Sequence, residues 1–124
     1  MWQKILLGVG VLAVGGLIVW GALSSDAPAA GDAGNPNAPV VYYYGDGCPH
    51  CEDVQAFFDE EGIVFGEDLA KKEVWSNRAN REEMLSRAEE CGLTPEDVGV
   101  PFLWAEGKCS VGEPDVVDYF EERN

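Results

Sequence analysis

The stretch at residues 47–51, Gly-Cys-Pro-His-Cys, limits what this 124-residue chain can fold into more than any other. It follows an apolar run at residues 40–44 and precedes an amphipathic run that begins at Glu52. A strand, a short loop and a helix would place Cys48 at the helix N-terminus, where unpaired N–H groups and the helix dipole stabilise a thiolate. Cys51 follows one turn later on the same face, so the two cysteines can form and break a disulfide.

Each residue of this motif has a predicted role. Cys48 is the candidate nucleophile, and Cys51 is the resolving thiol that releases a substrate from a mixed disulfide. His50 is the only histidine of the chain, and a partly positive imidazole there would stabilise the Cys48 thiolate. The alternative for His50 is an exposed turn residue. Pro49 suits the first helical turn, where a missing N–H has no cost.

The cysteine content also admits a structural zinc site, with thiolates from Cys48, Cys51, Cys91 and Cys109. A second C-x-x-C is absent. On the outside of the membrane, zinc binding would also have to compete with oxidation of the cysteines to disulfides. Redox chemistry is therefore favoured, and neither a metal nor a cofactor is predicted. Three alternatives stay open for Cys91 and Cys109: a second, structural disulfide, two buried free thiols, or a relay pair that exchanges electrons with the first pair.

A second motif lies downstream, where Val100 and Pro101 precede an apolar run of strand type at residues 102–104. Together with Cys-Pro-His-Cys after an apolar strand, it resembles the thioredoxin superfamily over roughly residues 39–124. The resemblance implies a cis Pro101 that faces the dithiol and presents the backbone of Val100 to an extended peptide. It also implies substrate proteins with thiols or disulfides, and a redox partner, for which a membrane-bound protein is one candidate.

The dipeptide Pro49-His50 is the one that strongly oxidising DsbA-like proteins carry between their cysteines, so the resemblance implies an oxidising poise. The chain also departs from its relatives. Gly47 stands where thioredoxin has Trp before its first cysteine, and the inserted helical domain of DsbA is absent. Only Gly112 matches the paired glycine with which glutaredoxins, helped by basic residues, bind glutathione. The resemblance therefore implies a glutaredoxin-sized domain and not glutathione use.

Strands and helices alternate in the pattern of residues 39–124. The apolar run at residues 40–44 does not alternate, which suits a central strand that is buried on both faces. Gly62 ends the helix that starts at the cysteines. The next strand is predicted near residues 71–76, after an ambiguous stretch at residues 63–70.

The second half of this domain supplies a helix, a hairpin and a last helix. Asn80 and Glu83 fit an N-cap and its partner in a capping box, with Asn77 as a competing start. Two strands flank Glu106-Gly107, a hairpin signal, and Pro114 starts the last helix. The resulting order, βαβαββα, predicts an α/β fold of the minimal thioredoxin-like kind, a four-stranded mixed sheet with helices on both faces. The hairpin strands are predicted at residues 101–105 and 108–111.

The charge of the chain excludes one class of partner. Eight Lys and Arg against 23 Asp and Glu give a formal net charge of −15. Nucleic acid is not a predicted partner, because phosphate contacts need Lys and Arg. An acidic domain is also repelled by anionic lipid head groups. Asp46, Glu52 and Asp53 are interpreted as a solvated rim of the motif, and Trp75 and Trp104 as core or groove aromatics.

Residues 1–25 predict a single transmembrane anchor. Residues 5–23 carry no charge, and as a helix they would extend about 28 Å, close to the hydrocarbon thickness of a bilayer. Lys4 places the N-terminus in the cytoplasm and the domain on the extracytoplasmic side, periplasmic or extracellular. The alternative is a cleaved signal peptide, although its apolar region is usually shorter. Residues 26–38, rich in Ala, Gly, Pro, Asn and Asp, predict a flexible tether.

These features predict a membrane-tethered, extracytoplasmic thiol–disulfide oxidoreductase. It would act on protein thiols or disulfides through Cys48 and Cys51, with an oxidising poise. The alternative is a non-catalytic thioredoxin-like module that holds zinc or a protein partner through its cysteines.

Overall fold

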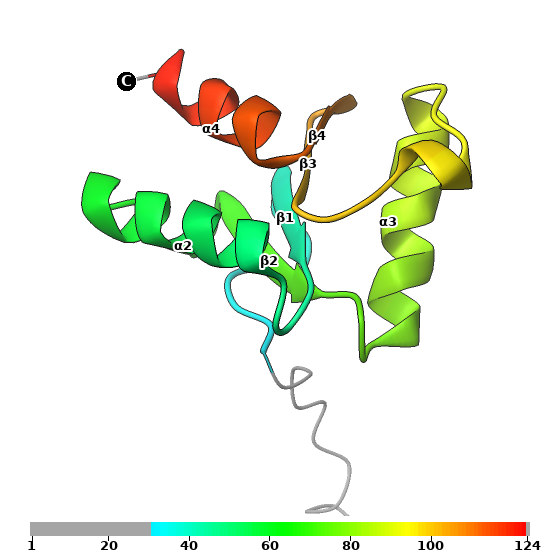
Figure 1. Cartoon of the computed structure of the whole chain (residues 1–124), viewed down its shortest axis with the longest axis horizontal. Helices are drawn as coiled ribbons and strands as arrows, with labels where there is room; N and C mark the ends of the chain where they lie inside the picture. The colour runs from blue at the N-terminus through cyan, green and yellow to red at the C-terminus, as the bar shows by residue number, and fades with distance from the viewer. Residues whose placement is uncertain (1–30, 124) are drawn as a thin grey trace, which may run out of the picture.

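The computed structural model describes residues 31–123, which form a four-stranded mixed sheet with helices on both faces (Figure 1). The strand order across the sheet is β2-β1-β3-β4. The strands are β1 (Val40–Tyr44), β2 (Leu69–Glu73), β3 (Phe102–Ala105) and β4 (Lys108–Val111). The helices are α2 (Pro49–Glu61), α3 (Arg78–Glu90) and α4 (Glu113–Glu121), with a 3-10 turn η1 (Pro95–Asp97). The predicted α/β order βαβαββα is confirmed for these residues.

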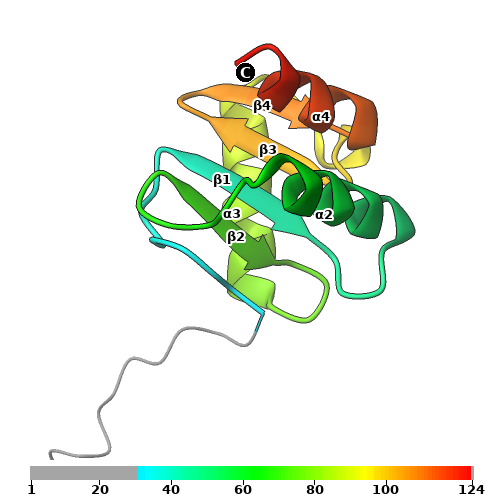
Figure 2. The same ribbon diagram turned by 90° about the vertical axis from the view of Figure 1, so that its left-hand side faces the viewer.

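Strand β1 is central and divides its side chains between two cores. Helices α2 and α4 cover one face of the sheet and α3 covers the other (Figures 1 and 2). Tyr42 packs with Val54 and Phe58 under α2, whereas Tyr43 packs with Met84 under α3. Both tyrosines are buried, so the prediction of a strand covered on both faces is confirmed.

Strand β2 begins earlier than the sequence predicted, because it spans Leu69–Glu73 and not residues 71–76. It pairs in parallel with β1, with Val40 opposite Leu69 and Tyr44 opposite Glu73. The strand ends at Glu73 because the Glu73 carboxylate accepts hydrogen bonds from the backbone N–H groups of Trp75 and Ser76. These bonds turn the chain where the sequence predicted that it would stay extended.

Helix α3 begins at the competing start. The Asn77 side chain accepts a hydrogen bond from the Asn80 N–H at 3.0 Å and is the N-cap. The prediction of a capping box at Asn80 and Glu83 is therefore wrong. Glu83 instead lies 2.8 Å from the Lys72 ammonium group and accepts a hydrogen bond from the Tyr43 hydroxyl at 2.9 Å. These tertiary contacts, which link α3 to the sheet, outweigh the local capping pattern.

The predicted hairpin is confirmed. Strands β3 and β4 pair antiparallel on either side of Glu106 and Gly107, whose φ angles are 49° and 87°. Two positive φ angles in a two-residue loop match the right-handed twist of the strands. Helix α4 follows Gly112 as its N-cap and has Pro114 in its first turn.

Residues 31–38, the described part of the predicted tether, lie along the outer edge of β2. Ala33 and Lys71 exchange two backbone hydrogen bonds of 3.0 and 2.8 Å. The Asn35 N–H donates to the Gly66 carbonyl at 2.8 Å, and Ala38 is buried in the core under α3.

The predicted anchor or signal peptide at residues 1–25 lies outside the described residues, as do residues 26–30 of the predicted tether. Within residues 31–123, no helix is long and apolar enough to cross a membrane.

Candidate functional site

Cys48 occupies the N-cap of α2, at the end of the loop that leaves β1. Its backbone is extended, and its Sγ lies 3.2 Å from the Cys51 N–H, which points at it from the first turn. Gly47 has a φ of 89° and allows the tight entry to the helix. Pro49 follows at the first helical position. The fold thus aims a backbone donor and the positive end of a helix at the Cys48 sulfur.

Cys48 and Cys51 form a disulfide, with their Cα atoms 5.2 Å apart. Each residue is only 4% exposed, so solvent exposure does not show which of the two cysteines is the nucleophile. The N-cap position does distinguish them, because the Cys51 N–H and the helix dipole both act on the Cys48 sulfur. The arrangement can carry dithiol–disulfide exchange.

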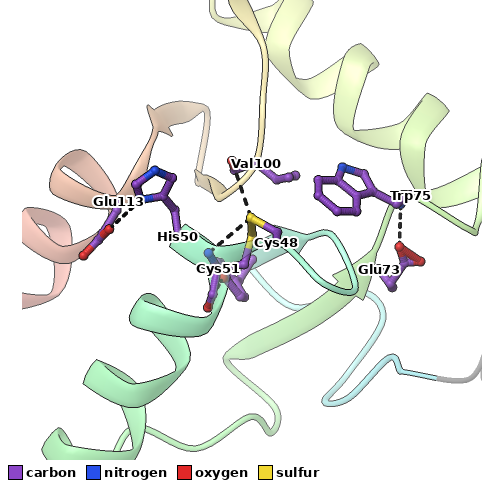
Figure 3. The surroundings of a disulfide bond; sticks show 8 residues. Cys48, His50, Cys51, Glu73, Trp75, Val100 and Glu113 are labelled. Carbon is purple, nitrogen blue, oxygen red and sulfur yellow. Dashed lines mark hydrogen bonds and ion pairs between the residues drawn. A yellow bond between two sulfur atoms is a disulfide. The ribbon is translucent and has the colours of Figure 1, made fainter.

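Val100 and Pro101 lie directly over this disulfide. Their peptide bond is cis, the form that the family resemblance implied, and the Val100 carbonyl oxygen lies 4.0 Å from the Cys48 Sγ (Figure 3). The Pro101 carbonyl accepts a hydrogen bond from the Gly112 N–H at 2.8 Å. Within residues 31–123, no backbone N–H donates to the Val100 carbonyl. That carbonyl is therefore available to an incoming backbone beside the sulfur.

His50 faces α4. Its Nδ1 lies 3.0 Å from the Glu113 Oε2, and the two side chains are 73% and 34% exposed (Figure 3). Sequence reasoning missed Glu113, and the one signal was an acidic residue in the first turn of the last helix. Because this carboxylate opposes the field of an imidazolium, the predicted influence of His50 on Cys48 belongs to the pair and not to His50 alone.

One group of metal-ligating side chains converges within the described residues: His50, Asp53 and Glu113, whose ligand atoms lie within 4.8 Å of one another. His50 and Glu113 stand on the first turns of α2 and α4, where the positive helix ends oppose a cation, and Asp53 follows His50 by three residues on α2. No cysteine belongs to this group. The four-thiolate zinc alternative is not supported, because the cysteines form two separate pairs.

The second pair, Cys91 and Cys109, forms a disulfide that links the C-cap of α3 to β4. Its Cys109 side chain borders the core under α3. Beside it, the Arg87 guanidinium stacks over the Trp104 ring at 3.9 Å from the ring centroid. Of the three alternatives for this pair, the disulfide is the form that the structure contains.

A small cavity of about 130 Å³ lies behind Cys51 and was missed by sequence reasoning. Lys71 of β2 lines it and donates to the Gln55 side chain at 3.0 Å. Burial lowers the pKa of Lys71, and the charge of Asp59 partly offsets this effect. Tyr42, another lining residue, donates its hydroxyl to the Cys51 carbonyl at 3.4 Å, and burial raises the pKa of that hydroxyl.

Among comparisons with known proteins, only those with solved structures give matches. No protein-family model and no curated protein matches the chain. Among solved structures, a crystal structure of wheat glutaredoxin matches it with 26% identity and a TM-score of 0.50, covering 69% of this chain and 72% of its own. A buckwheat glutaredoxin, solved as a complex with glutathione, has 19% identity and a TM-score of 0.49, covering 68% and 70%.

The wheat structure adds weight to the features already described. The sheet order, the C-x-x-C pair at a helix N-terminus and the cis proline beside it agree with a glutaredoxin-like domain. Such a domain supports thiol–disulfide oxidoreductase activity in general, with thiol-containing proteins as substrates and redox partners. Residues 31–123 form a domain of the thioredoxin superfamily.

Proposed function

We propose that this protein is a membrane-tethered thiol–disulfide oxidoreductase that oxidises the thiols of other proteins on the extracytoplasmic side. The observation that carries the proposal is the position of Cys48 at the N-cap of α2, with the Cys51 N–H 3.2 Å from its sulfur. That position stabilises a thiolate on Cys48 and makes it the better leaving group of a mixed disulfide.

The reaction begins with the oxidised pair. A substrate thiolate attacks the Cys48 Sγ, the bond to Cys51 breaks, and Cys51 leaves as a thiolate. A second substrate thiolate then attacks the substrate sulfur of the mixed disulfide, and Cys48 leaves as a thiolate. The substrate loses two electrons and two protons and gains a disulfide. Cys48 and Cys51 take up these electrons and protons and become a dithiol. A redox partner must remove these two electrons before the next turnover.

The oxidising direction follows from the stability of the reduced form. Whatever stabilises the Cys48 thiolate makes the disulfide a stronger oxidant. The helix dipole and the Cys51 N–H act in that direction, and a protonated His50 adds to them. Glu113 and the rim carboxylates Glu52 and Asp53 act against it. Glu52 and Asp53 are exposed to solvent, which screens their charge, and the half-buried Glu113 is paired with His50.

Substrate placement rests on the cis proline loop. An extended substrate that pairs with the Val100 backbone would bring its cysteine toward the Cys48 sulfur, because the Val100 carbonyl lies 4.0 Å from it. Pro101 fixes the direction of this loop. The dithiol itself supplies the redox chemistry, so the reaction requires no bound cofactor.

The location rests on the N-terminal sequence. The uncharged run at residues 5–23, with Lys4 before it, fits a single anchor whose N-terminus is cytoplasmic. A disulfide-forming domain would then lie on the oxidising side of the membrane. A membrane-bound protein in the same bilayer is the proposed recycling partner.

Trapping of a substrate tests the proposal. In full-length protein, Cys51→Ser should accumulate a mixed disulfide with a substrate protein supplied in its disulfide form. The Cys48 thiolate attacks that disulfide, one substrate sulfur leaves as a thiolate, and the thiol that would resolve the new bond is gone. Cys48→Ser should give neither the trapped species nor substrate oxidation. The matched control is the Cys91→Ala/Cys109→Ala variant, which retains both reactive cysteines. Unchanged substrate oxidation in Cys48→Ser would exclude the proposed function.

A further inference from the structure

We propose that a hollow at the carboxyl ends of β1 and β2 receives a Lys or Arg side chain of the substrate polypeptide. The inference rests on the proposed function and names the class of substrate, a basic polypeptide segment. The hollow has a volume of about 330 Å³, at the lower end of the range of ligand pockets. It is lined by Gly31, Tyr44, Asp46, Glu73 and Ser76.

The hollow is negatively charged. Two of its lining side chains are the carboxylates Asp46 and Glu73, and Glu73 is only 5% exposed. Within residues 31–123, Lys and Arg form their ion pairs elsewhere, with carboxylates of α3. The Lys71 Nζ lies 4.4 Å from the Tyr44 ring centroid, but it donates to the Gln55 side chain and forms no ion pair within these residues. Among the described residues, the Glu73 carboxylate accepts hydrogen bonds from backbone N–H groups alone. These bonds stabilise the carboxylate but leave its negative charge uncompensated, so it would attract a cationic ligand.

Tyr44 lies in the field of the same carboxylates. Burial raises the pKa of its hydroxyl, and the charges of Glu73, Asp32 and Asp46 raise it further. Three carboxylates therefore act on one side chain of the hollow. Asp32 has neutral partners within the described residues, since it accepts hydrogen bonds from the Glu73 N–H and the Asn80 amide.

The arrangement suits an organic cation better than a metal ion. Metal ligands must converge on one point, and within residues 31–123 the one group that does so is His50, Asp53 and Glu113. The carboxylates of Asp32, Asp46 and Glu73 do not form such a group. A Lys or Arg side chain needs no convergence, because it carries one charge at the end of an apolar stem.

Trp75 supplies an aromatic wall next to the hollow. Its side chain is 52% exposed, and one face of the indole covers Gly45, whose missing Cβ would overlap the ring atoms Cγ, Cδ2 and Cε2. The turn that carries Trp75 is held by the Glu73 carboxylate, which positions the backbone of this residue. Tryptophan is the best aromatic partner of a cation, and it can also cover an apolar stem.

The hollow lies close to the reactive sulfur. Asp46 precedes Cys48 by two residues, which span at most about 7 Å, and the Gly45 carbonyl accepts the Cys48 N–H at 3.1 Å. Figure 3 places Trp75 and His50 on opposite sides of Cys48. A substrate whose cysteine reaches Cys48 would thus bring a side chain one to three residues away to the hollow.

Three peptides test the proposal, identical except for Lys, norleucine or Glu two residues from a single cysteine. The full-length oxidised protein should react fastest with the Lys peptide and slowest with the Glu peptide. Asp46→Asn and Trp75→Leu should each reduce the Lys-to-norleucine rate ratio about two- to fivefold, the size of one exposed charge interaction. The ratio divides out any effect of either substitution on the Cys48 thiolate or on the apolar stem, because those effects act on the Lys and norleucine peptides alike.

Glu89→Gln is the matched control, because it removes the same charge from an exposed position on α3. It should leave the rate ratio unchanged. A Lys preference that falls equally in Asp46→Asn and Glu89→Gln would mean that overall charge attracts the peptide, and the proposal would be overturned. Equal rates for the three peptides with wild-type protein would overturn it as well.

Binding separates this inference from the proposed function. Peptides with Ser in place of Cys cannot react, so NMR titration of the Trp75 indole N–H measures recognition alone. A saturable shift with the Lys peptide and none with the Glu peptide is expected, even if no exchange activity exists. Exchange without charge preference would leave the proposed function intact and exclude the hollow as a substrate site.

Discussion

The Nδ1 of His50 and the Oε2 of Glu113 lie 3.0 Å apart and connect the first turns of α2 and α4, although 63 residues separate them in sequence. The contact places a carboxylate against the histidine of the redox motif. A positive imidazole favours the Cys48 thiolate, and the carboxylate opposes it. The motif histidine is therefore one half of an ion pair whose net field acts on the sulfur.

Removal of the imidazole should make the pair less oxidising. His50→Asn is expected to shift the reduction potential of the Cys48–Cys51 couple toward reducing values by about 10–30 mV, since about 30 mV corresponds to 1.4 kcal/mol. Glu113→Gln should shift it the other way, because it removes the carboxylate that opposes the field of the imidazole. Asp118→Asn, an exposed carboxylate of the same helix, is the control. Equal potentials in all variants would show that the ion pair does not act on Cys48.

The Cys91–Cys109 disulfide should contribute to stability and not to turnover. The two cysteines are 18 residues apart, and closing a loop of this length is worth about 3 kcal/mol. Urea unfolding of the Cys91→Ala/Cys109→Ala variant should show a loss of that size, with substrate oxidation retained. A folded variant that no longer oxidises substrate would instead identify this disulfide as an electron relay.

Some elements could be predicted from sequence because local chemistry fixes them. The Cys48–Pro49 start of α2, the Gly62 end and the Glu106-Gly107 hairpin each depend on residues next to one another. The ends of strand β2 could not be predicted from the sequence, because the strand starts where Leu69 pairs with Val40 of another strand.

The choice between two helix starts also required the tertiary structure. Asn77 and Asn80 are equally good caps by type. The structure decides because the Asn80 amide donates to Asp32 and to the Glu73 carbonyl, and both contacts depend on residues distant in sequence. The hollow could not be predicted from the sequence for the same reason. Asp46 and Glu73 come together only because the parallel strands β1 and β2 end side by side.

Alkaline pH should unfold the protein through its buried tyrosines. Burial raises the pKa of the Tyr42 and Tyr43 hydroxyls, and Glu83 adds to the effect at Tyr43. Above about pH 10 the unfolded chain loses these protons while the folded chain retains them. The unfolded state then binds fewer protons, so the free energy of unfolding falls as pH rises. Urea titrations from pH 8 to 11.5 should show this decline, and Tyr43→Phe should make it shallower. A flat profile would contradict the burial argument.

Gly45 should be intolerant of a side chain because Trp75 occupies the space. A methyl group there would overlap the indole, so Gly45→Ala should cost about 1–3 kcal/mol or displace the ring. Chemical denaturation measures the cost, and the NMR signal of the Trp75 indole reports the displacement. Gly66→Ala is the control, since a Cβ at Gly66 meets no atom within 4 Å. Equal behaviour of the two variants would show that Gly45 does not seat the indole.

The reduction potential of the Cys48–Cys51 couple tests the central claim most directly. Full-length protein would be equilibrated against glutathione buffers, with the redox state of all four cysteines followed by mass spectrometry. A reversible two-electron couple at about −120 to −180 mV is predicted for an oxidant of this design. A value near −270 mV would contradict the oxidising direction, and the absence of any reversible couple would contradict the redox function itself.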